Sequence, residues 1–331
     1  MSVRQARVGV AGAGKWGMNV VRTLAKLGSL AAVCDADLRP LEDIRSHYDN
    51  VRVFCDYATM LRLAKLDAVA IAAPAPMHAA LALQAIDAGM HVFVEKPLAL
   101  CVEDAERVVD AAKSANVKLV VGHVLLYHPA VQWALRAIRE GRIGDVRHFR
   151  SRRLSWGRLR SHEDVWWSFA PHDVAVMLEV FGEAPHSATA ASGAFVRPHV
   201  GDVAYADFRF SMGRTAHVEV AWIDPEKRSG FDVFGSRGTI SFSDGSGGPR
   251  VSLTPCGDRL NARGEPELWR GETECPEIPP AEPLTLELDA FCRAIRGGRM
   301  PPTDGEEGLA VVRTLAMAGE YPSAFRMEAI S

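Results

Sequence analysis

The chain has 331 residues, of which 48% are hydrophobic and 24% charged, a composition typical of a globular protein with room for two ordinary domains. Its formal net charge of −3 excludes the basic field of nucleic-acid-binding proteins, so we expect no nucleic-acid partner. No apolar run reaches the roughly 20 residues of a membrane-spanning helix, so we expect no membrane contact. The amino-terminal segment enters a strand pattern directly, which predicts no signal peptide.

The six cysteines lack the Cys-x-x-Cys spacing of zinc and redox sites, and several lie in apolar runs. This usage favours buried thiols in a reducing cytosol over a disulfide framework, so we expect a cytoplasmic protein. The eleven histidines show no paired ligand spacing on one helix, and no metal is predicted.

Residues 6–122 alternate short apolar strands with amphipathic helices, which predicts a parallel sheet with helices on both faces. Such doubly wound α/β domains bind ligands at the carboxyl ends of their strands. The expected strands are 6–11, 30–34, 51–54, 67–72, 90–94 and 118–122, and the expected helices are 15–27, 38–48, 57–65, 78–88 and 102–115.

A glycine-rich turn joins the first strand to the first helix in the segment VGVAGAGKWG, residues 8–17. Gly12 permits the tight turn, Gly14 lets the backbone approach a pyrophosphate, and Gly17 lets the helix pack close to the strand. The helix N-terminus adds unpaired N–H groups and partial positive charge, which favour a phosphate. This order of elements predicts a Rossmann domain whose dinucleotide contacts Gly12, Ala13, Gly14, Lys15 and Trp16.

Asp35 ends the second strand, about 20 residues after the turn, where such domains hold the ribose of their cofactor. A carboxylate there can accept hydrogen bonds from both ribose hydroxyls and repels a 2′-phosphate, so NAD is the expected cofactor. Arg39 follows four residues later and is able to meet a 2′-phosphate, so NADP stays open as an alternative.

The pattern changes after Gly122, where strands with a period of two replace the regular alternation. Residues 244–283 are rich in Gly, Pro and Glu and are expected to form hairpins and a long surface excursion. We predict a NAD-binding domain over 1–123 and an α+β domain with a large, mostly antiparallel open sheet over 124–331. The expected elements are helices 129–140, 284–297 and 305–319 and strands 145–153, 202–210, 216–222, 231–234 and 239–243.

The strand of residues 91–94 runs directly into Glu95-Lys96-Pro97, which puts a lysine at the carboxyl end of a parallel strand, where such folds bind ligands. Together with the glycine-rich turn, this motif makes the chain resemble the glucose–fructose oxidoreductase/inositol dehydrogenase (Gfo/Idh/MocA) family of NAD(P)-dependent sugar dehydrogenases. The resemblance covers almost the whole chain. Its most specific stretch is ALALQAIDAGMHVFVEKPLAL at 80–100, and FDVFGSRGTISF at 231–242 and the run from Leu284 to Ala318 also match.

The resemblance implies roles for residues of the first domain. Lys96 would contact the reacting sugar hydroxyl, and the loop after the fourth strand would lie along the cofactor. A histidine that begins a helix, such as His78, is often only a cap, and this alternative stays open. The expected cofactor contacts beyond the turn and Asp35 are Ala73, Pro74, Ala75, His78, Glu95, Lys96 and His123.

In the second domain the resemblance assigns the acid/base role to His172, near the start of a helix. Pro171 and the apolar spacing after it predict that this helix begins there. The sequence departs from the commonest family pattern, because Ser168 stands where an aspartate is usual and Leu126 where an arginine is frequent. Asp173 could orient His172 or bind a sugar hydroxyl, so these changes leave the substrate open.

The chemistry of these side chains suits the oxidation of an alcohol. An imidazole titrates near neutrality and suits a general base, and the ammonium of Lys96 would stabilise a developing alkoxide. The alternatives are a capping or core role for His172 and a surface position for Lys96.

Arginines are concentrated in RHFRSRRLSWGRLRSH, residues 147–162, which contains no lysine. Guanidinium forks favour bidentate phosphate contacts, which indicates a nucleotide-linked sugar. Because side chains alternate along a strand, at most half of these arginines can serve a ligand, and the others would be solvated or lie at a subunit interface. Nearby tryptophans could pack on a sugar or base. The expected substrate contacts are Lys96, Arg150, Arg153, Trp167, Ser168, His172 and Asp173.

The His-Asp variant in WSFAPHD resembles the branch of the family that acts on nucleotide sugars. That resemblance implies oxidation of the 3-hydroxyl of UDP-N-acetylglucosamine to a keto sugar, which a partner aminotransferase would use in lipopolysaccharide (lipid A) or polysaccharide biosynthesis. Three alternatives stay open: a UDP-N-acetylglucosaminuronate 3-dehydrogenase, a free-polyol dehydrogenase of the inositol type, and a non-catalytic NAD-sensing protein. Family members usually associate through the open sheet, so a homodimer or homotetramer is expected.

Overall fold

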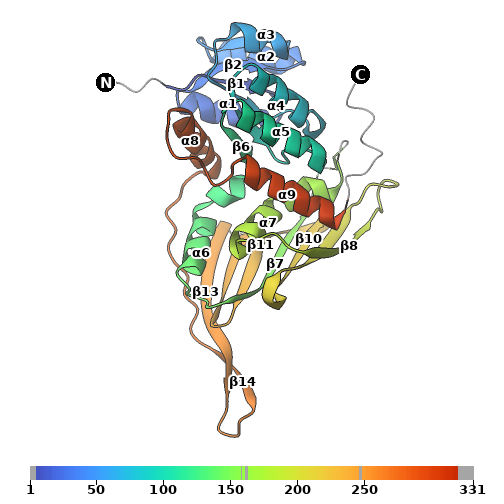
Figure 1. Cartoon of the computed structure of the whole chain (residues 1–331), viewed down its shortest axis with the longest axis vertical. Coiled ribbons are helices and arrows are strands. Elements are labelled where there is room, and N and C mark those ends of the chain that lie inside the picture. Colours follow the sequence, from blue (N-terminus) through green and yellow to red (C-terminus); the bar gives the residue numbers. More distant parts are fainter. Residues whose placement is uncertain (1–4, 158, 161–162, 246–247, 320–331) are drawn as a thin grey trace. The chain divides into compact units, whose positions relative to one another are not determined.

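The computed structural model describes residues 5–157, 159–160, 163–245 and 248–319, which form two compact units (Figure 1). The first unit takes the chain up to Val124 together with Glu282–Arg313, and the second takes Leu125–Ala281 together with the described residues from Thr314 onward. The prediction instead placed all residues after 123 in the second domain. Within the described residues, no helix combines the length and the apolar character needed to cross a membrane.

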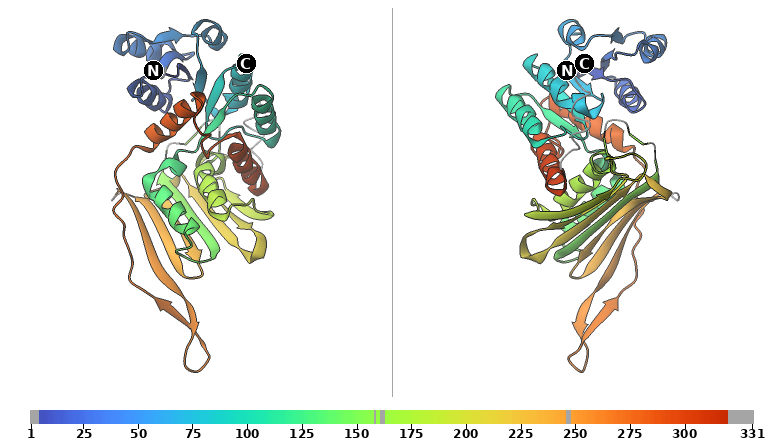
Figure 2. Two further views of the ribbon diagram at one scale, coloured as in Figure 1. Left: turned by 60° about the vertical axis from the view of Figure 1, so that its left-hand side comes forward. Right: turned by 90° about the vertical axis from the view of Figure 1, so that its right-hand side faces the viewer.

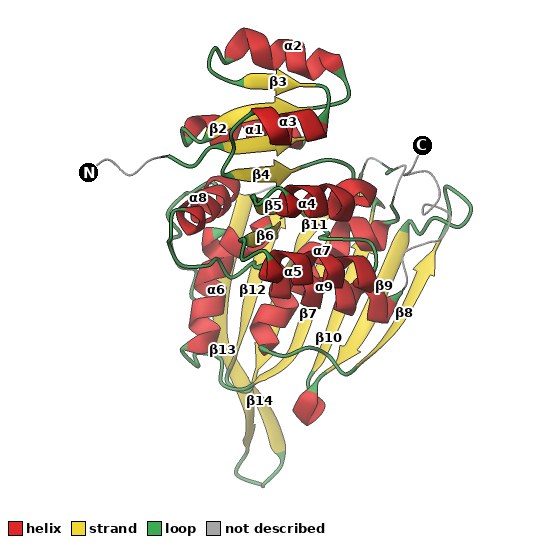
Figure 3. Cartoon of the chain, turned by 45° about the horizontal axis from the view of Figure 1, so that its top comes forward, coloured by secondary structure: helices red, strands yellow, loops and turns green. Residues whose placement is uncertain are grey.

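Six parallel strands form the sheet of the first unit, in the order β3-β2-β1-β4-β5-β6 (Figure 3). The order reverses between β1 and β4, at the point where folds of this kind bind their ligand. The predicted strands and helices of residues 6–122 all form, and the expected doubly wound α/β fold is confirmed. They are β1 (Val8–Ala11), α1 (Gly17–Lys26), β2 (Leu30–Cys34), α2 (Leu38–His47), β3 (Arg52–Phe54), α3 (Tyr57–Leu63), β4 (Ala68–Ile71), η1 (Ala75–Met77), α4 (His78–Asp87), β5 (His91–Glu95), α5 (Val102–Ser114) and β6 (Leu119–Gly122).

Helix α8 (Pro283–Ile295) belongs to the first unit, although it follows the second unit in sequence. Its apolar residues Leu284, Leu288 and Phe291 are buried in the core that surrounds Phe93, and the Phe93 and Phe291 ring centroids are 5.8 Å apart. The periodicity of the sequence predicts an apolar helix face but not the sheet that covers it. The prediction therefore counted this helix in the second domain, whereas the structure groups it with the first unit.

An eight-stranded sheet forms the second unit, in the order β14-β13-β12-β11-β7-β10-β9-β8. Its neighbouring strands pair antiparallel except β7 and β10, so the expected mostly antiparallel sheet is confirmed. Helices α6 and α7 pack on this sheet (Figure 2), and β13 and β14 extend as a long hairpin within the region expected to form hairpins (Figure 1). The elements after β6 are η2 (Val124–Tyr127), α6 (Pro129–Arg139), β7 (Val146–Trp156), α7 (Val165–Phe181), β8 (Ser187–Gly193), β9 (Val203–Arg209), η3 (Ser211–Gly213), β10 (Thr215–Ala221), β11 (Ile223–Gly235), β12 (Gly238–Gly245), β13 (Gly248–Leu260), β14 (Pro266–Arg270) and, after α8, α9 (Gly305–Ala318).

Helix α7 begins at Val165, so the prediction that it starts at Pro171 was wrong. The side chain of Asp164 caps the helix by accepting a hydrogen bond from the backbone N of Trp167 at 2.9 Å. Pro171 lies inside the helix, where it lacks the N–H that the fourth preceding carbonyl would accept. The buried residues before the proline favour the longer helix, since their burial offsets the loss of that hydrogen bond.

The packing of α8 predicts unequal effects for two neighbouring leucines. Leu288→Ala should lower the free energy of unfolding by about 2–5 kcal/mol, because it opens a cavity in a core where Leu288 is fully buried. Leu286→Ala on the same helix should change it by less than about 1 kcal/mol, because Leu286 is 37% exposed. Urea denaturation of both variants checks this, and equal effects would contradict the packing of α8 on the first unit.

Candidate functional site

The glycine-rich turn between β1 and α1 depends on glycine at two positions. Gly12 has a φ of +97°, and a Cβ there would lie 2.7 Å from the backbone of Ala72. A Cβ on Gly17 would lie 2.1 Å from the carbonyl oxygen of Gly12. A Cβ on Gly14 would meet no described atom within 4 Å, so the turn leaves open space on this side. Gly12 and Gly17 therefore serve the fold, while the open space at Gly14 fits the approach of a pyrophosphate.

The Asp35 carboxylate lies at the end of β2 and contacts the turn. It accepts hydrogen bonds from the backbone N of Ala13 at 2.5 Å and from the backbone N of Asp37 at 2.9 Å. A carboxylate has about four acceptor positions, so two remain for ribose hydroxyls. Arg39, the residue that left NADP open, is paired with the Asp37 carboxylate at 2.6 Å.

The loop after β4 is fixed by a buried histidine. The ring nitrogens of His78 lie 2.8 Å from the carbonyl oxygen of Ala73 and 2.7 Å from that of Pro97. His78 therefore connects the loop containing Ala73, Pro74 and Ala75 to the Glu-Lys-Pro segment after β5. Both ring nitrogens of His78 contact the protein backbone, which indicates a structural role. The expected contact of His78 with the cofactor stays a prediction.

The Glu95-Lys96-Pro97 segment lies at the carboxyl end of β5, the same edge of the sheet as the glycine-rich turn. Oε1 of the buried Glu95 accepts a hydrogen bond from Nε1 of Trp16 at 2.5 Å, and Oε2 accepts one from the backbone N of Lys96 at 3.3 Å. Burial raises the pKa of Glu95, and its contacts with Trp16 and Lys96 oppose that rise. Lys96 is half-buried, and its peptide bond to Pro97 is cis.

Two carboxylates that were not predicted from the sequence lie near Glu95. Nδ1 of the buried His123 is 2.7 Å from Oε2 of Glu307 on α9. Glu287 on α8 is fully buried, and among the described residues neither of its oxygens has a hydrogen-bond partner. Burial, followed by repulsion from Glu95 and Glu307, raises the pKa of Glu287 well above its usual value. A glutamate on the apolar face of a predicted helix was the available signal for this residue.

In the second unit, the predicted residues of α7 surround a buried ion pair. Arg153 on β7 donates from Nε to Oδ2 of Asp173 at 2.7 Å and from Nη2 to Oδ1 at 3.2 Å. Burial raises the pKa of Asp173, while the guanidinium of Arg153 opposes the rise. Asp173 adjoins the half-buried His172, so the ion pair fixes this part of α7 to the sheet.

A further carboxylate lies one helical turn before His172. The hydroxyl of Ser168 donates to Oε1 of Glu163 at 3.0 Å, and the side chain of Glu163 is 15% exposed. Ser168 and His172 are four residues apart and share a face of α7. Glu163 therefore brings a carboxylate to the position where the family pattern usually has an aspartate. The sequence does not reveal this residue, because Glu163 precedes the helix and no spacing rule connects it to Ser168.

The two arginines expected to bind substrate lie on opposite faces of the sheet. Arg153 faces α7, whereas Arg150 pairs with Asp232 of β11 at 2.7 Å. Arg152 shares the face of Arg150 and pairs with Glu219 of β10 at 3.2 Å. Arg158 lies outside the described residues. The structure therefore brings Arg153, but not Arg150, to the face that carries Trp167, Ser168, His172 and Asp173.

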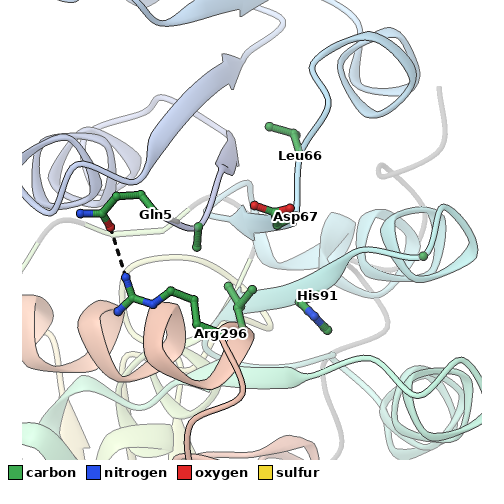
Figure 4. Close-up of a pocket in the computed structure, with 8 residues that line it drawn as sticks. Gln5, Leu66, Asp67, His91 and Arg296 are labelled. Carbon is green, nitrogen blue, oxygen red and sulfur yellow. Dashed lines mark hydrogen bonds between the residues drawn. The ribbon is translucent and has the colours of Figure 1, made fainter. Parts of the chain in front are cut away.

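A surface pocket of about 400 Å³ lies at the amino ends of the strands in the first unit (Figure 4). Its polar lining comes from Gln5, Asp67, His91 and Arg296, and Arg296 donates a hydrogen bond to Gln5 at 3.2 Å. The glycine-rich turn and Lys96 belong to the carboxyl ends of the same strands. This pocket is therefore separate from the predicted dinucleotide site and contains none of its residues.

The sheet order, the glycine-rich turn and the carboxylate after β2 define a dinucleotide-binding protein of the Rossmann class. Residues 6–123 match the model of the oxidoreductase family with an NAD-binding Rossmann fold, and residues 131–241 match that of the GFO/IDH/MocA C-terminal domain. The chain belongs to the GFO/IDH/MocA family of oxidoreductases, and its cofactor is NAD.

Several characterised proteins are similar to this chain. A UDP-N-acetylglucosamine 3-dehydrogenase from Acidithiobacillus ferrooxidans is 29% identical over 67% of this chain and 69% of its own length. A 1,5-anhydro-D-fructose reductase from Ensifer adhaerens is 31% identical over 76% of this chain and 78% of its own. A solved structure of the A. ferrooxidans enzyme superposes with a TM-score of 0.84, at 25% identity, over 98% of this chain and 99% of that chain.

Alanine substitutions at Gly14 and Gly17 distinguish the role of the turn in NAD binding from its role in folding. Gly14→Ala should fold like the wild type and weaken NAD binding about tenfold or more, because the new methyl group enters open space that the pyrophosphate needs. Gly17→Ala should also destabilise the protein by about 1–3 kcal/mol, because the methyl group overlaps a backbone oxygen. Thermal unfolding and calorimetric titration with NAD check both effects. Unchanged NAD binding in Gly14→Ala would contradict the proposed approach of the pyrophosphate.

The cap of α7 predicts a pH dependence of stability. Burial, followed by the nearby Glu163 charge, raises the pKa of Asp164 from 3.8 to about 6. The folded state therefore binds a proton more readily than the unfolded state, so the penalty for the charged form is absent below pH 3.8 and complete above pH 6. Asp164→Asn keeps a capping oxygen and removes this penalty. Its stability relative to the wild type should be greater at pH 7.5 than at pH 4, as urea denaturation would measure, and an equal difference at both pH values would contradict this.

Proposed function

We propose that this protein oxidises a secondary hydroxyl of a sugar with NAD, and that its substrate is UDP-N-acetylglucosamine, oxidised at C3. The observation that carries the proposal is the position of Lys96. It lies at the carboxyl end of β5, on the same sheet edge as the NAD-binding turn, and the buried Glu95 holds its backbone. A cation in that position is suited to the oxygen of an alcohol that reacts with a nicotinamide.

Lys96, His172 and NAD would each have a distinct role in the oxidation of the alcohol. Lys96 donates a hydrogen bond to the reacting hydroxyl oxygen and stabilises the negative charge that develops there. His172 accepts the hydroxyl proton as the general base. NAD, when bound, supplies the acceptor for the hydride that leaves the sugar carbon. The C–H electron pair thus leaves with the hydride, the O–H bond breaks toward the imidazole, and a ketone remains.

Three features support a UDP-linked substrate. The A. ferrooxidans relative carries the name of a UDP-N-acetylglucosamine 3-dehydrogenase. Arg153, on the α7 face of the sheet, supplies a guanidinium, although Asp173 already engages it. Glu163 and Ser168 add polar groups one turn from His172 that suit sugar hydroxyls. The keto product is the chemical substrate that an aminotransferase needs, which fits a role in amino-sugar synthesis.

An absorbance assay for NADH with a panel of sugars tests the substrate class. UDP-N-acetylglucosamine should support turnover more efficiently than UDP-N-acetylglucosaminuronate or free myo-inositol. A preference for the uronate or for inositol would overturn the C3 assignment on UDP-N-acetylglucosamine and keep sugar oxidation. If the protein binds NAD but no sugar leads to the formation of NADH, the NAD-sensing alternative would be favoured instead.

Replacement of Lys96 tests the catalytic assignment. Lys96→Met should lower kcat by about 10²–10³-fold, because it removes the donor to the developing alkoxide, while NAD binding stays near that of the wild type. Lys113→Met is a matched control, because Lys113 is 60% exposed and pairs with Glu306 on the surface. Steady-state kinetics and NAD titration measure these effects, and near-normal turnover by Lys96→Met would refute the role.

A further inference from the structure

One buried carboxylate in the first unit joins two segments of the NAD-binding half of the site. Glu95 is 7% exposed and accepts a hydrogen bond on Oε1 from the indole of Trp16 and on Oε2 from the backbone of Lys96. Trp16 belongs to the glycine-rich turn, and Lys96 directly follows β5. The carboxylate therefore connects the turn that binds the pyrophosphate to the lysine proposed for catalysis.

The neighbouring strand is shaped to hold this carboxylate. Gly122 pairs with Glu95 across β5 and β6, and a Cβ on Gly122 would lie 3.0 Å from Oε2 and 3.1 Å from Cδ of Glu95. A Cβ this close would crowd the Glu95 carboxylate and force it to move. The absence of a side chain at Gly122 thus leaves the space in which Glu95 faces the turn.

Asp35 holds the start of the turn at Ala13, but helix α1 at the end of the turn has no side-chain cap. Trp16 occupies the N-cap position, makes no side-chain capping hydrogen bond, and the first turn of α1 contains no acidic residue. An uncapped N-terminus leaves its N–H groups available to a phosphate but does not fix the turn. Trp16 is 44% exposed, and its indole donates a hydrogen bond to the buried Glu95. This hydrogen bond therefore connects the partly exposed Trp16 to the protein interior.

The charges around Glu95 come from four elements. Lys96 after β5 and His123 after β6 favour its ionised form. Glu307 on α9 is engaged by His123, and Glu287 on α8 has no hydrogen-bond partner among the described residues. Glu287 is fully buried, and burial together with repulsion from Glu95 and Glu307 raises its pKa well above the usual value. Glu95, by contrast, accepts hydrogen bonds from two N–H donors and precedes a lysine, and these contacts favour its charged form.

We propose that the Trp16–Glu95 hydrogen bond is a latch that holds the glycine-rich turn in its NAD-binding conformation, with ionised Glu95 as a positioning residue for the turn and for Lys96. NAD binding follows from the family, whereas the consequence for Lys96 rests on the proposed function. Without the latch, a smaller fraction of the protein has a binding-competent turn, and the apparent affinity for NAD falls by that fraction.

Two conservative substitutions and their combination test the latch. Trp16→Phe keeps an aromatic ring and removes the N–H, and Glu95→Gln keeps the shape and removes the charge. Each should raise the Kd for NAD by about 5–20-fold, because a hydrogen bond to a charged acceptor is lost or weakened. The double variant should bind NAD no more weakly than the weaker single variant, since both changes remove the same interaction. Calorimetric titration without sugar measures all four proteins, with Trp269→Phe and Glu42→Gln as matched controls.

The pH dependence of NAD binding separates a charged latch from simple packing. Burial raises the pKa of Glu95, so the wild type should lose NAD affinity as pH falls through that raised pKa. Glu95→Gln and Trp16→Phe should lack this component between pH 5 and pH 8.5. Additive losses in the double variant, unchanged affinity in folded Glu95→Gln, or wild-type pH dependence in that variant would each overturn the latch. Because no sugar is present, these results do not depend on whether the proposed sugar oxidation is correct.

Discussion

The close backbone contact between Gly12 and the end of β4 is the constraint on which the first unit depends. No side chain fits at Gly12. Residue 17 must also be glycine, because a Cβ there would overlap the carbonyl oxygen of Gly12 at the start of α1. Together they fix the path of the turn, and that path brings the indole of Trp16 to the carboxylate of Glu95. The same geometry thus produces an open approach at Gly14 and a connection to the residue before Lys96. Cofactor binding and the placement of the proposed catalytic cation are consequences of one backbone contact.

Buried carboxylates organise both units, but in different ways. In the second unit, Asp173 is fully buried and compensated by a bidentate contact with Arg153, which fixes α7 to the sheet. In the first unit, Glu95 is held by N–H donors, whereas Glu287 has no hydrogen-bond partner among the described residues and burial raises its pKa. These arrangements place buried carboxyl groups next to Lys96 and His172 in the sequence. Low dielectric surroundings make such contacts stronger than they would be in water.

The first unit could be predicted almost completely, because strict alternation of strands and helices, glycine spacing and the terminal carboxylate are local signals. The sequence could not show that α8 returns to this unit, because an apolar helix face does not identify the sheet that covers it. Pro171 misplaced the start of α7, because tertiary burial and the Asp164 cap outweigh the local cost of a proline. The contacts of Glu163 with Ser168 and of Trp16 with Glu95 join residues whose proximity only the folded chain establishes. Strand alternation predicts that Arg150 and Arg153 lie on opposite faces of the sheet. It does not predict which of the two faces α7.

An isotope experiment tests whether the hydrogen at C3 of the sugar is transferred to NAD. UDP-N-acetylglucosamine carrying deuterium at C3 would be incubated with the protein and NAD, and the reduced cofactor analysed by mass spectrometry. The proposed reaction should give one deuterium in the NADH and a keto sugar that has lost it. Unlabelled NADH, or no NADH with this substrate, would contradict it.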